Sequence, residues 1–388
     1  MSGPLRPPPG GKAAPQLYTI AHADLAFSAV PGRPAFAALD TIIIDSTRFN
    51  CAFLSRGRGV PRSGDSKHRP GDIAMTFKAL LATKTDEKIS TSVVEMTELD
   101  LMPGDVTVAV DYSTVNYKDA IAISGRGEII RQFPLIPGID LAGTVEASSY
   151  PGIAVGDRVV VNGWALSQTH HGGYAQKARV KGEWLVKIPA PFSTKDAMAI
   201  GTAGYTAMLS VLALEQGGLT PKRGDVLVTG ANGGVGSIAV QLARRAGATV
   251  LGIAGPSNDA WLADHGAVPV NYGDDLPARL RAAAQSGHID ALLDFFGGGY
   301  VAMAVEDLRV PRDRVDTITD FDAVERFAVQ SAGGADAATA AVVAELADLV
   351  ARGELEVPIA GVFALDDVRD AYRELELRHT RGKLVLRP

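Results

Sequence analysis

The chain has 388 residues and a formal net charge of −6 at pH 7; 46% of the residues are hydrophobic and 21% are charged. These values are ordinary for a soluble globular protein of two domains, and the negative charge argues against nucleic acid and anionic membrane surfaces as partners. The single cysteine, Cys51, excludes an intramolecular disulfide framework and a thiolate zinc cluster. No apolar run approaches the length of a membrane span and no signal-peptide core is present, so we expect a cytoplasmic location.

Residues 1–74 differ in composition from the rest of the chain. The first stretch is rich in proline and glycine, and residues 55–72 form a polar, basic run with turn-forming residues throughout. Between them only residues 39–45 have the pattern of a strand. Because this composition cannot bury a core, we expect a disordered extension, or upstream sequence preceding a start at Met75. A targeting or interaction arm is the alternative.

After Met75 the chain has the pattern of an all-β module that extends to about Pro191. Short apolar runs alternate with Pro-Gly, Gly-Asp and similar turn signals, which is typical of consecutive strands. The predicted strands are residues 77–82, 106–116, 141–148 and 157–165.

A strand–turn–helix–strand unit follows and predicts a dinucleotide site. Residues 226–228 form a short apolar strand, a glycine cluster comes next, and helical spacing of apolar residues starts at Val235. Gly247 ends the helix, and Thr249–Ala254 is the second strand. Glycines are needed in such a turn because a pyrophosphate must approach the backbone closely at the helix N-terminus.

The end of the second strand indicates which dinucleotide is bound. NAD sites usually carry an acidic residue there for the ribose 2′-hydroxyl, but this strand continues into Gly255, Pro256 and Ser257, with no carboxylate until Asp259. Ser257 can donate to a 2′-phosphate. The sequence therefore favours NADPH, although no arginine or lysine neighbours Ser257.

The remaining chain alternates helices and strands, which predicts a parallel, doubly wound sheet. A helix over 197–215 leads into the nucleotide-binding unit. Helices are expected at 259–265, 276–284 and 301–308, and strands at 268–270, 289–294 and 314–318. A helix at 337–352, a strand at 357–363, a helix at 367–379 and a strand at 383–386 are expected to return to the β module. The expected domains are 75–196, completed by 333–388, and a Rossmann domain at 197–332.

Four segments carry a resemblance to a known superfamily: residues 115–145, 171–186, 201–208 and 228–237. They are similar to the zinc-free branch of the medium-chain dehydrogenases/reductases, and from Met75 to about Ala254 more closely to the acrylyl-CoA reductase family. Past about Trp261 the chain is more similar to quinone-oxidoreductase-like members. The resemblance implies a GroES-like β-barrel catalytic domain and a doubly wound Rossmann domain that binds NADPH.

The sequence predicts no metal site. Zinc-dependent relatives place His and Glu in the segment Pro137–Asp140, where Ile139 cannot bind a metal, and no cysteine follows residue 51. His170 and His171 have no cysteine or carboxylate close by and are interpreted as loop residues, with a role beside the substrate as the alternative.

The resemblance also implies the site residues. Asn116 and Tyr117 would lie at the nicotinamide, where an amide and a phenol can hydrogen-bond a carboxamide or an enolate oxygen. Thr202 would line the cleft or serve only in packing between domains, and Arg381 would reach the cofactor phosphates or be merely exposed. The residues expected to bind the cofactor are Tyr117, Thr202, Asn232, Gly233, Gly234, Val235, Gly236, Ser257, Tyr272 and Arg381.

The implied activity is NADPH-dependent hydride transfer to the β-carbon of an α,β-unsaturated carbonyl compound or thioester, such as acryloyl-CoA giving propionyl-CoA. An NADPH:quinone oxidoreductase is the first alternative, and a non-catalytic NADPH-binding sensor is the second. Relatives are commonly homodimers, so a homodimer is expected. A coenzyme A moiety would need a basic rim, for which the candidates are Lys118, Arg126, Arg131, Lys177 and Lys181, unless these residues only form a solvated face.

Overall fold

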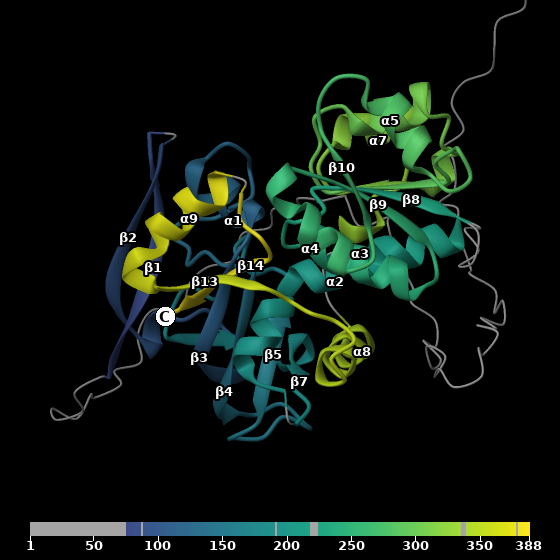
Figure 1. The fold of residues 1–388 in the computed structure, drawn as a ribbon. Helices are drawn as coiled ribbons and strands as arrows, with labels where there is room; N and C mark the ends of the chain where they lie inside the picture. Colours follow the sequence, from purple (N-terminus) through teal and green to yellow (C-terminus); the bar gives the residue numbers. More distant parts are fainter. Residues whose placement is uncertain (1–74, 87, 191, 218–223, 335–338, 378) are drawn as a thin grey trace, which may run out of the picture. The chain divides into compact units, whose positions relative to one another are not determined.

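The computed structural model describes residues 75–86, 88–190, 192–217, 224–334, 339–377 and 379–388 (Figure 1). The expectations for residues 1–74, including the strand at 39–45 and Cys51, lie outside these residues. The segment from Ile73 onward forms one compact unit.

The β module begins with an antiparallel hairpin of β1 (Thr76–Thr85) and β2 (Lys88–Thr97). A seven-stranded sheet follows in the order β13-β14-β3-β4-β5-β7, with β6 pairing β3 as well. Five of its strands come from residues 106–187: β3 (Val106–Val115), β4 (Asp140–Ser148), β5 (Arg158–Asn162), β6 (Lys177–Val180) and β7 (Val186–Lys187).

A short helix that the strand pattern did not predict follows β3 directly. α1 (Tyr117–Ser124) starts after Asn116, whose backbone N–H donates to Asp119 Oδ2 at 3.2 Å. This is half of a capping box, which favours a helix start at this point. The helix ends at Gly125, where φ is +69°. The polypeptide therefore turns sharply at the end of β3, and Tyr117 lies in the first turn of the helix.

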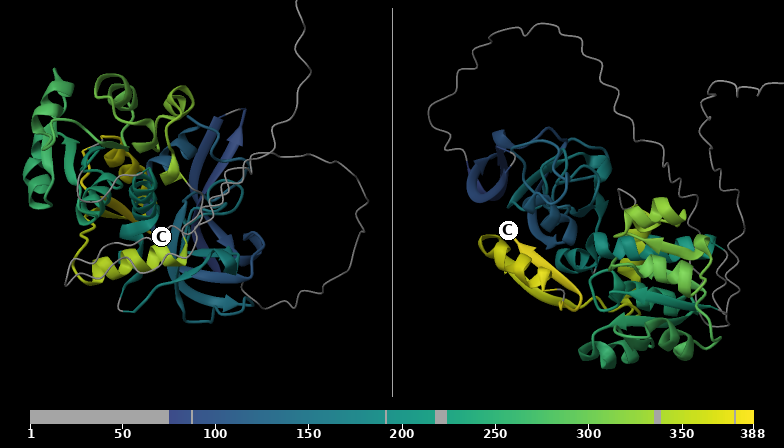
Figure 2. Two further views of the ribbon diagram at one scale, coloured as in Figure 1. Left: turned by 90° about the vertical axis from the view of Figure 1, so that its right-hand side faces the viewer. Right: turned by 90° about the horizontal axis from the view of Figure 1, so that it is seen from above.

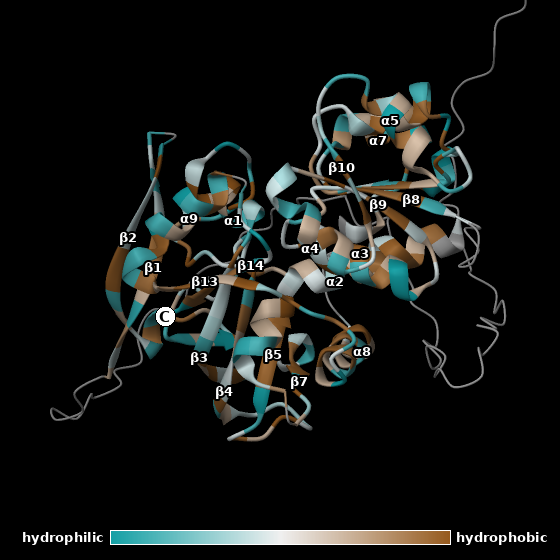
Figure 3. Ribbon diagram, viewed as in Figure 1, coloured by the Kyte–Doolittle hydropathy of each residue, from teal (hydrophilic) through white to brown (hydrophobic). Residues whose placement is uncertain are grey.

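α2 (Thr194–Gln216) connects the two sheets and is kinked at Gly201, where φ is 50° and ψ is −160°. The most apolar 18-residue window of Thr194–Leu214 has a mean hydropathy of 1.6, so this segment is long and apolar enough to span a membrane, which corrects the expectation that no apolar run reaches that length. Figure 3 colours much of this helix towards the apolar end of the scale. However, 89% of the most apolar window is buried inside the protein, as in a core helix.

The nucleotide-binding sheet has five parallel strands in the order β10-β9-β8-β11-β12, with helices on both faces (Figure 2). Leu227, Leu251 and Leu292 lie fully buried in its core. The strands are β8 (Asp225–Thr229), β9 (Thr249–Ala254), β10 (Val268–Asn271), β11 (Ala291–Asp294) and β12 (Val315–Thr317). The helices are α3 (Gly236–Arg245), α4 (Asp259–Asp264), α5 (Leu276–Ala283), α6 (Tyr300–Ala302), which continues as a π-helical turn to Asp307, and α7 (Phe321–Phe327).

The last elements return to the β module, as the sequence predicts. β14 (Lys383–Arg387) pairs antiparallel with β3 and parallel with β13 (Ile359–Ala364). α8 (Ala340–Ala351) precedes these strands and α9 (Val368–Glu376) lies between them in the sequence. The β module is therefore built from both ends of the described chain, while the domain boundaries proposed above stay predictions.

Candidate active site

The glycine turn after β8 leaves no room for a side chain at Gly236. A methyl group added at Gly236 would lie 2.2 Å from the carbonyl oxygen of Gly230, which is backbone and cannot move aside. Gly230 itself has φ of +57°, a conformation that favours glycine. The turn ends at the N-terminus of α3, where backbone N–H groups are available to an anion. These residues fit the pyrophosphate of a dinucleotide.

The loop after β9 receives a cation from the far end of the chain. Arg381 donates from Nη2 to the carbonyl oxygen of Ser257 and from Nε to Asn258 Oδ1, both at 3.2 Å. The ring of Tyr272 covers the same loop, because a methyl group added at Gly255 would lie 3.3 Å from the tyrosine hydroxyl. Tyr272 is 60% exposed. The structure thus brings together Ser257, Tyr272 and Arg381, three of the expected cofactor residues.

The segment around Arg381 also crosses the glycine turn. The backbone N–H of Gly382 donates to the carbonyl oxygen of Asn232 at 3.1 Å. The side chain of Lys383 lies over Gly234, where an added methyl group would come within 2.9 Å of Lys383 Cδ. Both βα loops of the nucleotide-binding unit are therefore in contact with one three-residue stretch of the C-terminal segment.

A buried carboxylate, Asp140, gathers the polar groups at the other end of the site. It accepts hydrogen bonds from Thr114 Oγ1 at 2.6 Å, Asn116 Nδ2 at 2.9 Å and Asn162 Nδ2 at 2.8 Å. The backbone N–H and the hydroxyl of Thr202, just past the kink of α2, donate to it as well. Asp140 was not singled out from the sequence, since an aspartate before an apolar strand gives no signal of this role.

A second buried carboxylate, Asp119, lies next to the first. Its Oδ2 accepts from the side chain of Asn116 at 3.1 Å and its Oδ1 accepts from the backbone N–H of Ile139 at 3.0 Å. Burial, reinforced by the charge of Asp140, raises the pKa of Asp119 to about 7. The hydrogen bonds from Asn116 and Ile139 oppose this shift but do not cancel it.

Asn116 and Tyr117 differ in what they can offer a substrate. The amide of Asn116 is engaged within the protein at both ends, by Lys383 at Oδ1 and by Thr114 and the two carboxylates at Nδ2. Tyr117 is 41% exposed. The guanidinium of Arg126 lies 6.0 Å from the centroid of the tyrosine ring. Direct contact with substrate is therefore better suited to Tyr117, and the catalytic role of Asn116 stays a prediction.

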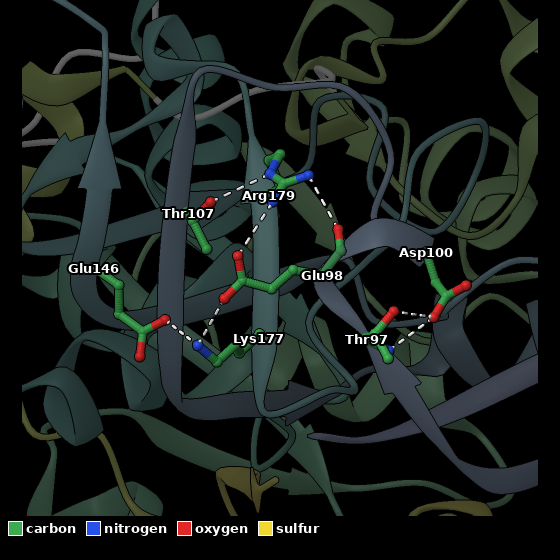
Figure 4. Close-up of polar contacts among 7 residues, drawn as sticks. All are labelled: Thr97, Glu98, Asp100, Thr107, Glu146, Lys177 and Arg179. Carbon is green, nitrogen blue, oxygen red and sulfur yellow. Dashed lines mark hydrogen bonds and ion pairs between the residues drawn. The ribbon is translucent and has the colours of Figure 1, made fainter. Parts of the chain in front are cut away.

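The candidates for a basic rim divide into two groups. Lys177 forms ion pairs with Glu98 at 3.0 Å and Glu146 at 2.5 Å (Figure 4). It pairs with Ala109 in the sheet, seven residues before Asn116 along β3, and at about 3.3 Å per residue this is roughly 23 Å away. Lys181 follows the last residue of β6, while Lys118 is exposed beside Tyr117. Arg126 lies beside Tyr117 as well and forms an ion pair with Glu376 at 2.6 Å. A basic rim, with Arg131 among its candidates, stays a prediction.

The two adjacent histidines serve the β module. His170 Nε2 lies 2.8 Å from the carbonyl oxygen of Arg179, and His171 Nδ1 accepts from the backbone N–H of Ile136 at 3.2 Å. Burial lowers the pKa of both side chains, so they are held neutral. Within the described residues, no three His, Cys, Asp or Glu side chains form a group that could hold a metal ion. A zinc-free site stays a prediction.

Comparison with known families agrees with this geometry. Residues 102–190 match the family model of the alcohol dehydrogenase GroES-like domain, and residues 263–386 match the model of zinc-binding dehydrogenases. Acrylyl-CoA reductase AcuI of Ruegeria pomeroyi is 43% identical over 236 residues, 60% of this chain and 72% of that protein. Probable acrylyl-CoA reductase AcuI of Escherichia coli is 46% identical over 221 residues, 56% and 68% of the two chains. Putative quinone oxidoreductase YhfP of Bacillus subtilis is 40% identical over 238 residues, 61% and 72%.

Solved structures share this fold. E. coli YhdH with bound NADPH has a TM-score of 0.65 and 34% identity, and the match covers 80% of this chain and 99% of that one. B. subtilis yhfP with NAD bound has a TM-score of 0.64 and 30% identity over 81% and 100% of the chains. Together with the glycine turn and the two sheets, these matches show that the chain is an oxidoreductase of the medium-chain dehydrogenase/reductase superfamily.

Proposed function

We propose that this protein is an NADPH-dependent, zinc-free reductase that saturates the C=C bond of an α,β-unsaturated thioester, converting acryloyl-CoA to propionyl-CoA. The observation that carries the proposal is the residue set on the two βα loops and at Tyr117, within a chain 43–46% identical to two reductases named for acrylyl-CoA.

The choice of NADPH over NADH is supported by Arg381. A 2′-phosphate carries negative charge that NADH lacks, and guanidinium groups bind phosphate through charge-assisted hydrogen bonds. Arg381 contacts the residues that follow β9, where a ribose is held in this fold. No carboxylate precedes Asp259 in that loop to bind a free 2′-hydroxyl.

Bound NADPH would supply the hydride that the β-carbon of the substrate accepts. The carbonyl oxygen of the thioester then gains negative charge, which a placed hydrogen-bond donor stabilises without a metal. Tyr117 is the side chain that we assign to this oxygen. We assign the proton for the α-carbon to water, because no described side chain beside Tyr117 is an evident acid for it.

A quinone is the second candidate substrate. It is favoured by the 40% identity to a putative quinone oxidoreductase and by the short basic rim. A flat apolar acceptor would need no contact with Lys118 or Arg131. A sensor that binds NADPH without turnover is a third, more distant reading. A homodimer and a cytoplasmic location stay predictions.

The test follows NADPH oxidation by the full-length protein with acryloyl-CoA and, separately, with a simple benzoquinone, and repeats both with NADH. The proposal expects rapid turnover of acryloyl-CoA that prefers NADPH. The matched control is acrylic acid, which has the same double bond without coenzyme A. Turnover of the quinone alone would refute the thioester assignment, and stoichiometric NADPH binding without any turnover would favour the sensor.

A further inference from the structure

Lys383 is a buried lysine that neither the sequence patterns nor the proposed chemistry uses. It opens β14 and only 4% of its surface is exposed. Its Nζ donates to Asn116 Oδ1 at 2.6 Å, across 267 residues of sequence. Its stem lies on the glycine turn at Gly234. One side chain thus extends from the nucleotide loop to the residue before Tyr117.

The ammonium determines how the Asn116 amide is oriented. An ammonium has donors only, so it must face the amide oxygen, while the carboxylate of Asp140 accepts only and must face the amide nitrogen. The observed contacts obey this rule, at 2.6 Å on the oxygen and at 2.9 and 3.1 Å on the nitrogen. The capping box also directs the backbone N–H of Asp119 to the Asn116 side chain, so the ammonium is the charged one of the donors that orient this amide.

The orientation of Asn116 is transmitted to α1. Its backbone N–H donates to Asp119 Oδ2, and its carbonyl oxygen accepts from the backbone N–H of Ala120 at 3.1 Å, so Asn116 fixes the first helical turn at both ends. Tyr117 is the first residue of that turn. The Asn116 side chain donates to the same Asp119 oxygen at 3.1 Å, so we expect a change in this side chain to loosen the turn that carries Tyr117.

We propose that Lys383 is a positioning residue, whose ammonium holds Asn116 and through it the turn that presents Tyr117 to the substrate. The inference rests on the proposed function only for the contact between Tyr117 and the substrate, because the contact between Lys383 and Asn116 does not depend on which substrate is used. Since Lys383 is the first residue of β14 and Arg381 lies two residues before it, Lys383 also links the geometry of the substrate end to the segment that carries Arg381.

The experiment compares three variants of the full-length protein with wild type. Lys383→Met keeps the stem on Gly234 and removes the ammonium; Lys383→Arg restores a cation. Lys187→Met is the matched control, because Lys187 is an exposed lysine in an ion pair with Asp157 at 2.7 Å. Amide hydrogen exchange of residues 116–124 is measured without NADPH or substrate, and kcat and KM are measured with both.

For Lys383→Met we expect exchange in residues 116–124 to rise and kcat to fall, each about 10-fold, with KM for NADPH changed by less than about twofold. Lys383→Arg should restore part of the protection from exchange and part of kcat. Lys187→Met should change neither the exchange of residues 116–124 nor kcat. In an Asn116→Ala background, Lys383→Met should have no further effect on exchange.

Unchanged exchange in residues 116–124 would overturn the inference, as would an equal effect in the Asn116→Ala background. A rise in KM for NADPH with normal kcat would instead assign Lys383 to the cofactor. If Lys383→Met does not fold, Asn116→Ala, which leaves β14 untouched, must produce the rise in exchange. Absence of turnover by the wild type would refute the proposed function, while the exchange result would still decide the role of Lys383.

Discussion

Arg381 and Ser257 lie 124 residues apart in the sequence, yet the guanidinium of one donates to the carbonyl oxygen of the other at 3.2 Å. The loop after β9 contains no basic residue of its own. The C-terminal segment therefore supplies the positive charge that a local reading of the sequence finds missing beside Ser257.

Arg381→Ala is expected to weaken NADPH binding about 10- to 100-fold, the usual effect of losing a charge-assisted contact to phosphate. NADH binding should hardly change, since NADH has no 2′-phosphate. Fluorescence titration with each dinucleotide checks this. Arg387→Ala, an exposed arginine at the other end of β14, is the control. Equal weakening of both dinucleotides would show that Arg381 only supports the loop.

Gly236→Ala is expected to abolish dinucleotide binding, because its methyl group would lie 2.2 Å from the carbonyl oxygen of Gly230. Gly233→Ala should be milder, since its methyl group would lie 3.2 Å from the same oxygen. Calorimetric titration with NADPH, beside a melting curve for each variant, compares the two. If both variants bind as wild type does, the turn is not the pyrophosphate site.

The stability of the fold should depend on pH through Asp119. Its pKa is raised from 3.8 to about 7 in the folded protein, so folding favours the protonated carboxyl. The resulting contribution to stability is complete below about pH 4 and is lost as the pH rises through about 7. Between about pH 5.5 and 8 we expect the Tm of the wild type to fall relative to that of Asp119→Asn.

The control for this measurement is Asp157→Asn. Hydrogen bonds from the Ala154 N–H and from Lys187 hold the pKa of the Asp157 carboxyl below its usual range, so it titrates outside the tested window. The Tm of Asp157→Asn should change with pH in parallel with the Tm of the wild type. A wild-type curve parallel to that of Asp119→Asn would mean that Asp119 does not titrate near neutrality.

Two lysines of the proposed rim should respond differently to substitution. Lys118→Met should raise the KM for acryloyl-CoA several-fold, as expected for the loss of one exposed contact to a phosphate. Lys177→Met should leave that KM unchanged and lower the Tm, because Lys177 is paired with Glu98 and Glu146 and lies far along β3 from Asn116. Steady-state kinetics at saturating NADPH measures both, and the reverse pattern would place coenzyme A at the other end of the sheet.

Local patterns predicted most elements of the fold. β9 (Thr249–Ala254) has the predicted bounds, because Gly247 ends the preceding helix and Gly255 follows the apolar run directly. β2 was missed because its alternate residues are partly exposed, which leaves a weak apolar pattern in KISTSVVEMT. α1 was missed inside a run of strands, although Asn116 and Asp119 have the spacing of a helix cap.

The candidate site was predictable only where its chemistry is local. The glycine turn carries its own signal, because Gly230 has a positive φ and Gly236 lies against the carbonyl oxygen of Gly230, only six residues before it. Asp140 and Lys383 carry none, since their partners Thr202 and Asn116 are 62 and 267 residues away. From the sequence alone, a single aspartate or lysine is expected to be exposed, and only the fold shows that Asp140 and Lys383 are buried.

The pairing of β14 with β3 also has a consequence for synthesis on the ribosome. Asn116 is made 267 residues before Lys383, which at about 5 to 20 residues per second is roughly 15 to 50 seconds. Throughout that interval the end of β3 that later pairs with Leu384, Val385 and Leu386 is an open strand edge. A nascent chain therefore exposes an unpaired strand edge until β14 has been synthesised. We expect neighbouring nascent chains on the same messenger RNA to be the first chains that could pair with this edge.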